Sequence, residues 1–126
     1  MEAWERSLSG GLRLRVLRTD EAVVVLALAG EIDLANCTEL DVLTAQVAAD
    51  PTVEDLVVDL TDVGFLAACG VRCLVRTRNR ASARHRRMLL VVAPDAGLLR
   101  RVLTLVDGFE IVDSLAEAGV AAADLP

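Results

Sequence analysis

The sequence contains no lysine, no tyrosine and only one histidine in its 126 residues. An enzyme needs a nucleophile with a base, or a metal cluster, and the lone His85 lies in an arginine-rich segment without partner groups. Cys69 and Cys73 are spaced C-x-x-x-C, which differs from the redox motif C-x-x-C. A metal site needs more ligands than this sequence supplies. We therefore predict a chain that is not an enzyme, with no catalytic residues, no metal and no cofactor.

Long apolar runs are also lacking. None approaches the roughly 20 residues of a membrane span, and the first residues carry acidic side chains instead of the apolar core of a secretory signal. We expect a cytoplasmic protein that does not bind membranes and whose three cysteines are reduced thiols, with Cys37 and Cys73 in the core. The net charge of −6 argues against direct binding of nucleic acid.

The chain is nevertheless rich in residues that build a core. Hydrophobic residues make up 54% of it and charged residues 25%, a composition that excludes a disordered chain. A length of 126 residues suits one domain. We divide the chain into an N-terminal tail over residues 1–11 and a domain over residues 12–126.

Apolar periodicity predicts about five strands and about four helices. The strands are expected at 12–16, 22–29, 53–60, 87–93 and 109–112, and the helices from 34, over 70–83, around 98–103 and from 114. A turn over 19–21 makes the first two strands an antiparallel hairpin, Asp33 caps the first helix, and Ser114 with Glu117 fits a capping box. The alternation predicts a single α/β domain with a mixed, mostly parallel sheet. Segments 53–60 and 87–93 should be neighbouring central strands.

The stretch LVVDLTDVGFLAACGVRCLV, residues 56–75, reads as strand, loop and helix. Cys69 lies at the junction of loop and helix, where unpaired backbone N–H groups point outward and the helix dipole favours negative charge. The pattern D-L-x-x-V-x-F-x-x-x-x-G-V-x-x-L in this stretch resembles the central motif of the STAS domain. The segment from Gly30 to Asp33 is similar to the G-x-h-D element of that family.

This resemblance implies a STAS-like fold and the function of a bacterial anti-sigma factor antagonist. In that family the residues before the glycine usually read Asp-Ser-Ser or Asp-Ser-Thr, and the hydroxyl next to the glycine is a phosphorylation switch. Here Ala67, Ala68 and Cys69 occupy these positions, so we expect no phosphorylation at position 69. The implied partner is an anti-sigma factor of the histidine-kinase-like ATPase type, which the protein binds so that a sigma factor is released. The expected partner-binding residues are Asp33, Ala67, Ala68, Cys69, Gly70, Arg72 and Arg76.

Several alternatives remain open. Arg72, Arg76 and Arg80 form a basic ridge that is either a solvated helix face or a docking surface for an acidic protein. Cys69 either fills a serine-sized site or acts as a redox sensor, because a thiol at a helix N-terminus is readily ionised. The alternative to an antagonist is a scaffold or sensor STAS module of a larger signalling assembly, which would include a self-associating homodimer.

Overall fold

The computed structural model describes residues 2–19 and 22–121. Six strands, three α-helices and one short 3-10 helix occur in these residues. In chain order they are β1 (Glu2–Ser7), η1 (Ser9–Gly11), β2 (Arg13–Arg18), β3 (Val23–Ile32), α1 (Cys37–Ala49), β4 (Asp55–Leu66), α2 (Ala68–Ala83), β5 (Arg87–Val91), α3 (Gly97–Leu105) and β6 (Glu110–Val112). The predicted α/β class is confirmed.

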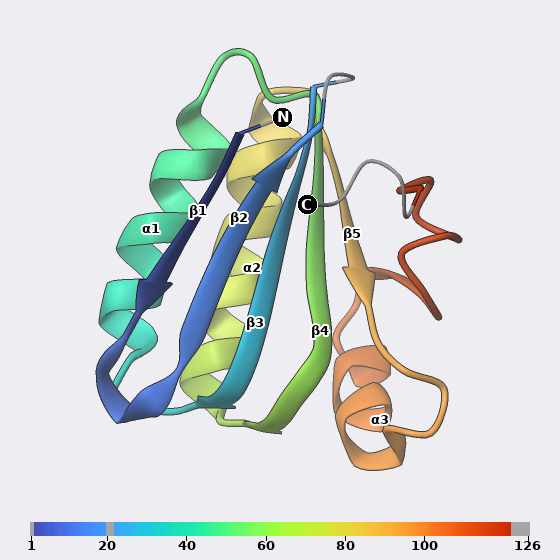
Figure 1. The fold of residues 1–126 in the computed structure, drawn as a ribbon. Helices are drawn as coiled ribbons and strands as arrows, with labels where there is room; N and C mark the ends of the chain where they lie inside the picture. The colour runs from blue at the N-terminus through green and yellow to red at the C-terminus, as the bar shows by residue number, and fades with distance from the viewer. Residues whose placement is uncertain (1, 20–21, 122–126) are drawn as a thin grey trace.

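The strands form one mixed sheet in the order β1-β2-β3-β4-β5-β6. The pairs β1–β2 and β2–β3 are antiparallel, and β3 to β6 are parallel. The prediction that 53–60 and 87–93 are neighbouring strands is confirmed, since Val57 pairs with Leu89 and Val58 with Leu90. Helices α1 and α2 lie side by side on one face of the sheet, and α3 lies beside the ends of β4 and β5 (Figure 1).

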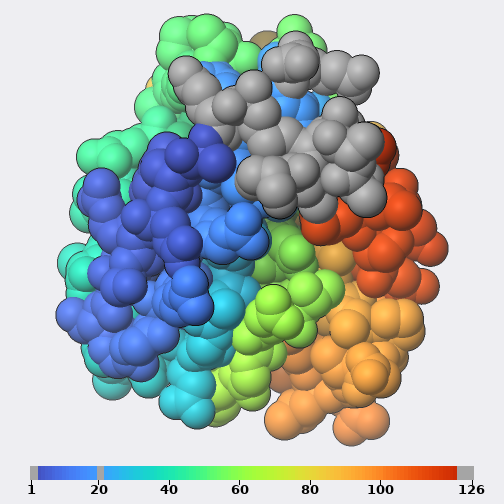
Figure 2. Space-filling model, in the orientation of Figure 1, coloured from blue at the N-terminus to red at the C-terminus, as the bar shows by residue number. Residues whose placement is uncertain are grey.

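The two faces of the sheet are covered differently, which follows from the sequence pattern. Leu14 and Val16 of β2 belong to the core that also holds the buried residues of α1 and α2. Arg15, between them, points to the other face and is exposed there. On that face Val57 and Leu89 pack with Val120 of the C-terminal segment. Figure 2 looks onto this second face.

The N-terminal part differs from the expectation. Residues 2–7 of the predicted tail form the edge strand β1, in which Trp4 pairs with Val16. The sheet therefore has one strand more than expected. The division into a tail and a domain stays a prediction.

The first helix begins later than predicted. It starts at Cys37 and not at Leu34. The reason is that Asp33 caps a turn: its Oδ1 accepts a hydrogen bond from the Ala35 N–H at 3.0 Å, and its backbone carbonyl accepts one from the Cys37 N–H at 3.0 Å. Local side-chain to backbone bonding of this kind competes with helix formation.

The strand of the central motif is longer than predicted, and the described residues after 113 do not form the predicted last helix. β4 continues to Leu66 through residues that were expected to form a loop. The capping hydrogen bond from the Glu117 N–H to Ser114 Oγ forms at 3.2 Å, yet it stabilises a turn that ends at Gly119, whose φ is 83°. The end of the predicted helix, residues 122–126, and residues 20–21 of the predicted turn lie outside the described residues. None of the described helices has the length and apolar character needed to cross a membrane.

Candidate functional site

The predicted site residues lie at the edge of the sheet where β3 and β4 end. This edge is at the lower end of the molecule in Figure 1. The Ala67 N–H donates a hydrogen bond of 2.8 Å to the carbonyl of Ile32, so the chain segments that leave the two strands run close together. Asp33 and the residues 67–70 are therefore neighbours in space although they are more than 30 positions apart in the sequence. This is the place where open α/β sheets build their binding sites.

The turn between β3 and α1 is held by the buried side chain of Asn36. Its Nδ2 donates to the carbonyls of Ser9 and Glu31 at 3.0 and 2.9 Å, and its Oδ1 accepts from the Asp33 N–H at 3.1 Å. Every polar group of the Asn36 amide thus has a partner in the interior. Because a buried amide with a lost partner is costly, this network fixes the position of Asp33 and the start of α1.

The start of α2 is packed tightly but is not capped. Ala67 is the N-cap residue, and no side chain bonds to the first N–H groups and no acidic residue lies in the first turn. A Cβ added at Gly70 would lie 2.5 Å from Leu66 Cδ1 and 2.7 Å from Ile32 Cγ2, so any larger residue here requires the Leu66 and Ile32 side chains to shift. The helix therefore presents free backbone donors and a partial positive charge to whatever approaches.

The structure joins Cys69 to Cys37 by a disulfide bond. Their Cα atoms are 6.2 Å apart, within the range that a disulfide requires. The expectation of three reduced thiols is therefore wrong, although Cys37 lies in the core as predicted. The pair could not be predicted from the sequence, because the two cysteines are 32 residues apart and only the fold brings the first turns of α1 and α2 together.

Cys73 is the remaining thiol and behaves as predicted. It is fully buried, and its Sγ lies 3.8 Å from Thr44 Oγ1 on α1. Burial raises the pKa of the Cys73 thiol, and the hydrogen bond of Thr44 offsets only part of that effect. Cys73 is thus a packing residue, while Cys69, four positions earlier, faces the site.

The arginine ridge of α2 divides into two parts. Arg76 Nε and Arg80 Nη1 lie 3.2 and 3.3 Å from the same carboxylate oxygen of Asp41 on α1. Burial by itself would raise the pKa of Asp41, but the hydrogen bonds and charges of the two arginines outweigh it and lower the pKa. Arg72 is exposed and has no ion pair within the described residues. Of the predicted ridge, Arg72 is therefore the cation available to a partner.

Exposed apolar side chains surround the start of α2, and the sequence analysis missed them. Leu34 is 86% exposed, Phe65 52% and Leu98 75%. A groove of about 280 Å³ lies between the end of β4 and α3, which are side by side at the lower right of Figure 2. Its lining consists of Gly64, Phe65, Leu66, Leu98, Leu99 and Val102. Exposed apolar clusters of this kind mark interaction surfaces.

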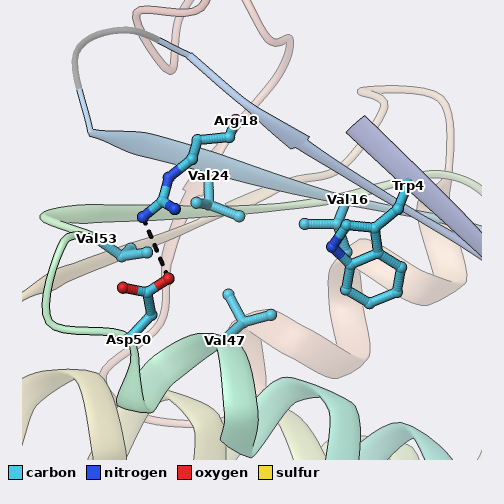
Figure 3. A pocket seen from close by; sticks show the side chains of 7 residues that line it. All are labelled: Trp4, Val16, Arg18, Val24, Val47, Asp50 and Val53. Atoms are coloured by element: carbon cyan, nitrogen blue, oxygen red, sulfur yellow. Dashed lines mark ion pairs between the residues drawn. The ribbon is translucent and has the colours of Figure 1, made fainter. Parts of the chain in front are cut away.

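A second hollow, of about 140 Å³, lies near the other end of α1 (Figure 3). Its apolar lining comes from the sheet, α1 and the loop between α1 and β4, and Trp4 closes one side. Arg18 Nη2 lies 3.3 Å from Asp50 Oδ2. The hydrogen bonds that Thr52 donates, together with Arg18, lower the pKa of Asp50. Since its two charged residues neutralise each other, this hollow has no group that selects a charged ligand.

Comparison with known proteins identifies the family. The family model described as "Mlab, STAS domain" matches residues 16–113, which is most of the chain. The chain therefore belongs to the STAS domain family. Over 78 residues it is 36% identical to the anti-sigma-F factor antagonist RsfA of Mycobacterium tuberculosis, strain H37Rv. This match covers 61% of the chain and spans only 60% of the length of that relative.

Solved structures agree with this assignment. An anti-sigma factor antagonist from Mycobacterium paratuberculosis has a TM-score of 0.76 and 26% identity, with 94% of this chain and 100% of that chain covered. Unphosphorylated SpoIIAA, another anti-sigma factor antagonist, has a TM-score of 0.69 at 17% identity over 84% of this chain and 93% of its own, which supports the fold alone. The antagonists are a non-catalytic class, in agreement with the prediction that this chain is not an enzyme.

We expect Gly70→Ala to lower the free energy of unfolding by about 1 to 3 kcal/mol, because the new methyl group overlaps Leu66 and Ile32. Urea denaturation measures the change. Gly64→Ala is the matched control, since a Cβ at Gly64 meets nothing within 4 Å. Equal stability of the two variants would contradict the tight packing at the start of α2.

The Asp41 carboxylate should contribute to stability only when it is ionised. Its pKa in the folded protein lies below its ordinary value of 3.8. The contribution is therefore present above that value and is lost as the pH falls through the lower folded pKa. We expect Asp41→Asn to lower stability by roughly 1 kcal/mol at neutral pH and to have little effect in strong acid. Urea titrations at several pH values test this, with the exposed Asp95→Asn as control; a pH-independent difference would argue against the ion pairs.

Proposed function

We propose that this protein is an anti-sigma factor antagonist whose docking face is the edge of the sheet around the start of α2. We define the docking face as Asp33, Leu34, Ala67, Ala68, Cys69, Gly70, Arg72 and Arg76, with the groove beside Phe65 next to it. The observation that carries the proposal is this fixed cluster at the start of α2, in which Leu34, Ala68 and Arg72 are exposed, in a chain that is 36% identical to RsfA over 78 residues. Its partner would be an anti-sigma factor of the histidine-kinase-like ATPase type, bound in the cytoplasm.

The composition of the docking face favours a protein partner. Leu34 and Phe65 offer apolar area that a partner can bury, and the helix start and Arg72 supply positive charge. Small side chains at Ala67 and Ala68 let a partner backbone come close. Steering by Arg72 favours an acidic partner surface. Binding alone, without any bond made or broken, would displace the sigma factor from the anti-sigma factor.

The face carries no acceptor for a phosphate at position 69. Cys69 has no hydroxyl, its sulfur is bonded to Cys37, and Ala67 lacks the carboxylate that is usual in the family. A phosphate at this point would add roughly −1.5 to −2 charge to the interface. We infer that this antagonist is not controlled by phosphorylation at that position. A scaffold role with self-association is the competing reading, and a stable homodimer with no affinity for anti-sigma factors would support it instead.

We expect Arg72→Glu to slow association with an anti-sigma factor from the same genome by about tenfold at low salt, because the change reverses the steering charge. Surface plasmon resonance at several salt concentrations measures the rate. Arg15→Glu is the matched control, since Arg15 is also exposed but lies on the opposite face of the sheet. Arg76 is unsuitable for this purpose because it also holds Asp41. If Arg72→Glu and Arg15→Glu slowed association equally, only net charge would matter.

We expect no phosphate on the wild-type protein after incubation with ATP and the kinase-type anti-sigma factor. Peptide mapping by mass spectrometry over residues 61–77 tests this, because Thr61 and Thr77 are the hydroxyl residues of that stretch. Thr77 is fully buried and donates to the Cys73 carbonyl at 2.8 Å. Cys69→Ser restores a hydroxyl and serves as the comparison, for which we expect partial phosphorylation. Stoichiometric phosphate on the wild type with loss of binding would refute the inference.

A further inference from the structure

The hollow beside the C-terminal end of α1 is separate from the docking face, which lies at the other end of this helix (Figure 3). Its volume is about 140 Å³, and its apolar walls are the side chains of Val16, Val24, Val47 and Val53. We propose that this hollow binds a small, uncharged and mainly apolar molecule that carries one hydrogen-bond acceptor, such as a cyclic ketone. The inference goes beyond the proposed function and does not depend on it.

The hollow exists because the core residues become smaller toward this end of the domain. Nearer the docking face, the buried residues of β2, β3 and α1 are leucines, namely Leu14, Leu26, Leu28, Leu40 and Leu43. Around the hollow the same three elements carry valines, each of which is one methylene group shorter. Empty space in a core forfeits contacts that a close-packed interior would make. A ligand of the right shape restores these contacts.

Trp4 covers the open side of the hollow and supplies a hydrogen-bond donor. It lies in the edge strand β1, where it pairs with Val16 of β2. The Arg6 guanidinium lies over its ring, 5.3 Å from the centroid, and this contact holds the indole in place. The indole nitrogen is on the ring edge that faces the other lining residues (Figure 3). Its N–H has no hydrogen-bond partner within residues 2–19 and 22–121, so an acceptor on a ligand would satisfy it.

The polar groups at the opposite side of the hollow select against charge. Asp50 pairs with Arg18 at 3.3 Å, and its Oδ1 accepts hydrogen bonds from the Thr52 N–H and Oγ1 at 2.9 and 2.7 Å. The Thr52 hydroxyl also accepts a hydrogen bond from Arg18. The three side chains therefore satisfy one another. A charged ligand would lose its hydration and find no counter-charge that is not already paired, so an uncharged ligand is favoured.

The size of the hollow limits the ligand to one small ring. An apolar cavity of about 150 Å³ inside a protein stays dry and binds a molecule such as benzene. The hollow of about 140 Å³ should therefore hold roughly six or seven non-hydrogen atoms. Its valine walls are stiff, because β-branched side chains have few rotamers, and the shape of the site is therefore preformed. Trp4 is 41% exposed, so the ligand enters past its ring.

The test uses the indole of Trp4 as the reporter. The chain has one tryptophan, so the proton–nitrogen NMR spectrum of the whole protein contains one indole N–H peak. Titration with cyclohexanone should move this peak downfield and should reach half-saturation at or below about 1 mM, an affinity that about seven atoms can supply. Cyclohexylammonium has the same ring and the same number of non-hydrogen atoms, but it carries a charge and no acceptor. It should leave the peak in place.

Variants separate the hollow from the surface of α1. Val47→Phe fills the hollow and should weaken cyclohexanone binding at least about tenfold. Val42→Phe is the matched control, since Val42 is 54% exposed on the same helix. Val47→Leu adds one methylene group and should give a smaller loss, which keeps the test valid if Val47→Phe does not fold. Trp4→Phe keeps a ring but removes the donor; with the backbone amides of Val16 and Val53 as reporters, binding should weaken about threefold to tenfold.

Several results would overturn the inference. An indole peak that cyclohexanone does not move is one, and an equal response to cyclohexanone and cyclohexylammonium is another. Equal affinity of the Val47 variants and Val42→Phe would show that the ligand binds elsewhere, and unchanged affinity of Trp4→Phe would refute the role of the indole N–H. None of these measurements involves an anti-sigma factor, so their failure would leave the proposed function unaffected.

Discussion

The docking face depends on the close contact between the start of α2 and the ends of β3 and β4. Gly70 lies so near Leu66 and Ile32 that a side chain at this position would have to push those two side chains aside. This contact fixes the position of the first turn of α2 relative to the ends of β3 and β4. It thereby decides that Ala67, Ala68 and Cys69 stand at the surface while Cys73, one turn later, is sealed against α1. The arrangement is rigid because packed interiors resist small displacements.

Charge on α2 serves two separate purposes. Asp41 forms ion pairs with Arg76 and Arg80 and thereby links α1 to α2, the two helices that cover one face of the sheet. Arg72 is one turn closer to the helix start, beyond the reach of this carboxylate, and stays exposed. Ion pairs at half-exposed positions contribute little to stability, but they fix which cations remain for a partner. The regular i+4 spacing of the three arginines therefore gave no sign that Arg76 and Arg80 pair with Asp41 while Arg72 stays exposed.

Regular elements with a strong apolar pattern were predictable from the sequence. The hairpin of β2 and β3, the adjacent strands β4 and β5, and the buried stripe of α1 follow from period 2 and period 3.6 patterning. The predictions failed where local polar contacts compete with those patterns. Asp33 bonds to the turn after it and delays α1 until Cys37, and Ser114 caps a turn that no apolar stripe extends into a helix. β1 was missed because its exposed residues carry little apolar signal.

By itself the sequence determined the fold class, the motif from Asp59 to Leu74 and the position of Cys69 at the start of a helix. These features follow from short sequence patterns, which can be recognised without the three-dimensional structure. Only the tertiary structure decided that Cys69 meets Cys37, that Asp41 takes two of the three ridge arginines, and that Phe65 borders a groove with α3. Each is a contact between segments about 30 or more residues apart. Such contacts depend on how sheet and helices pack, and periodicity carries no information about that.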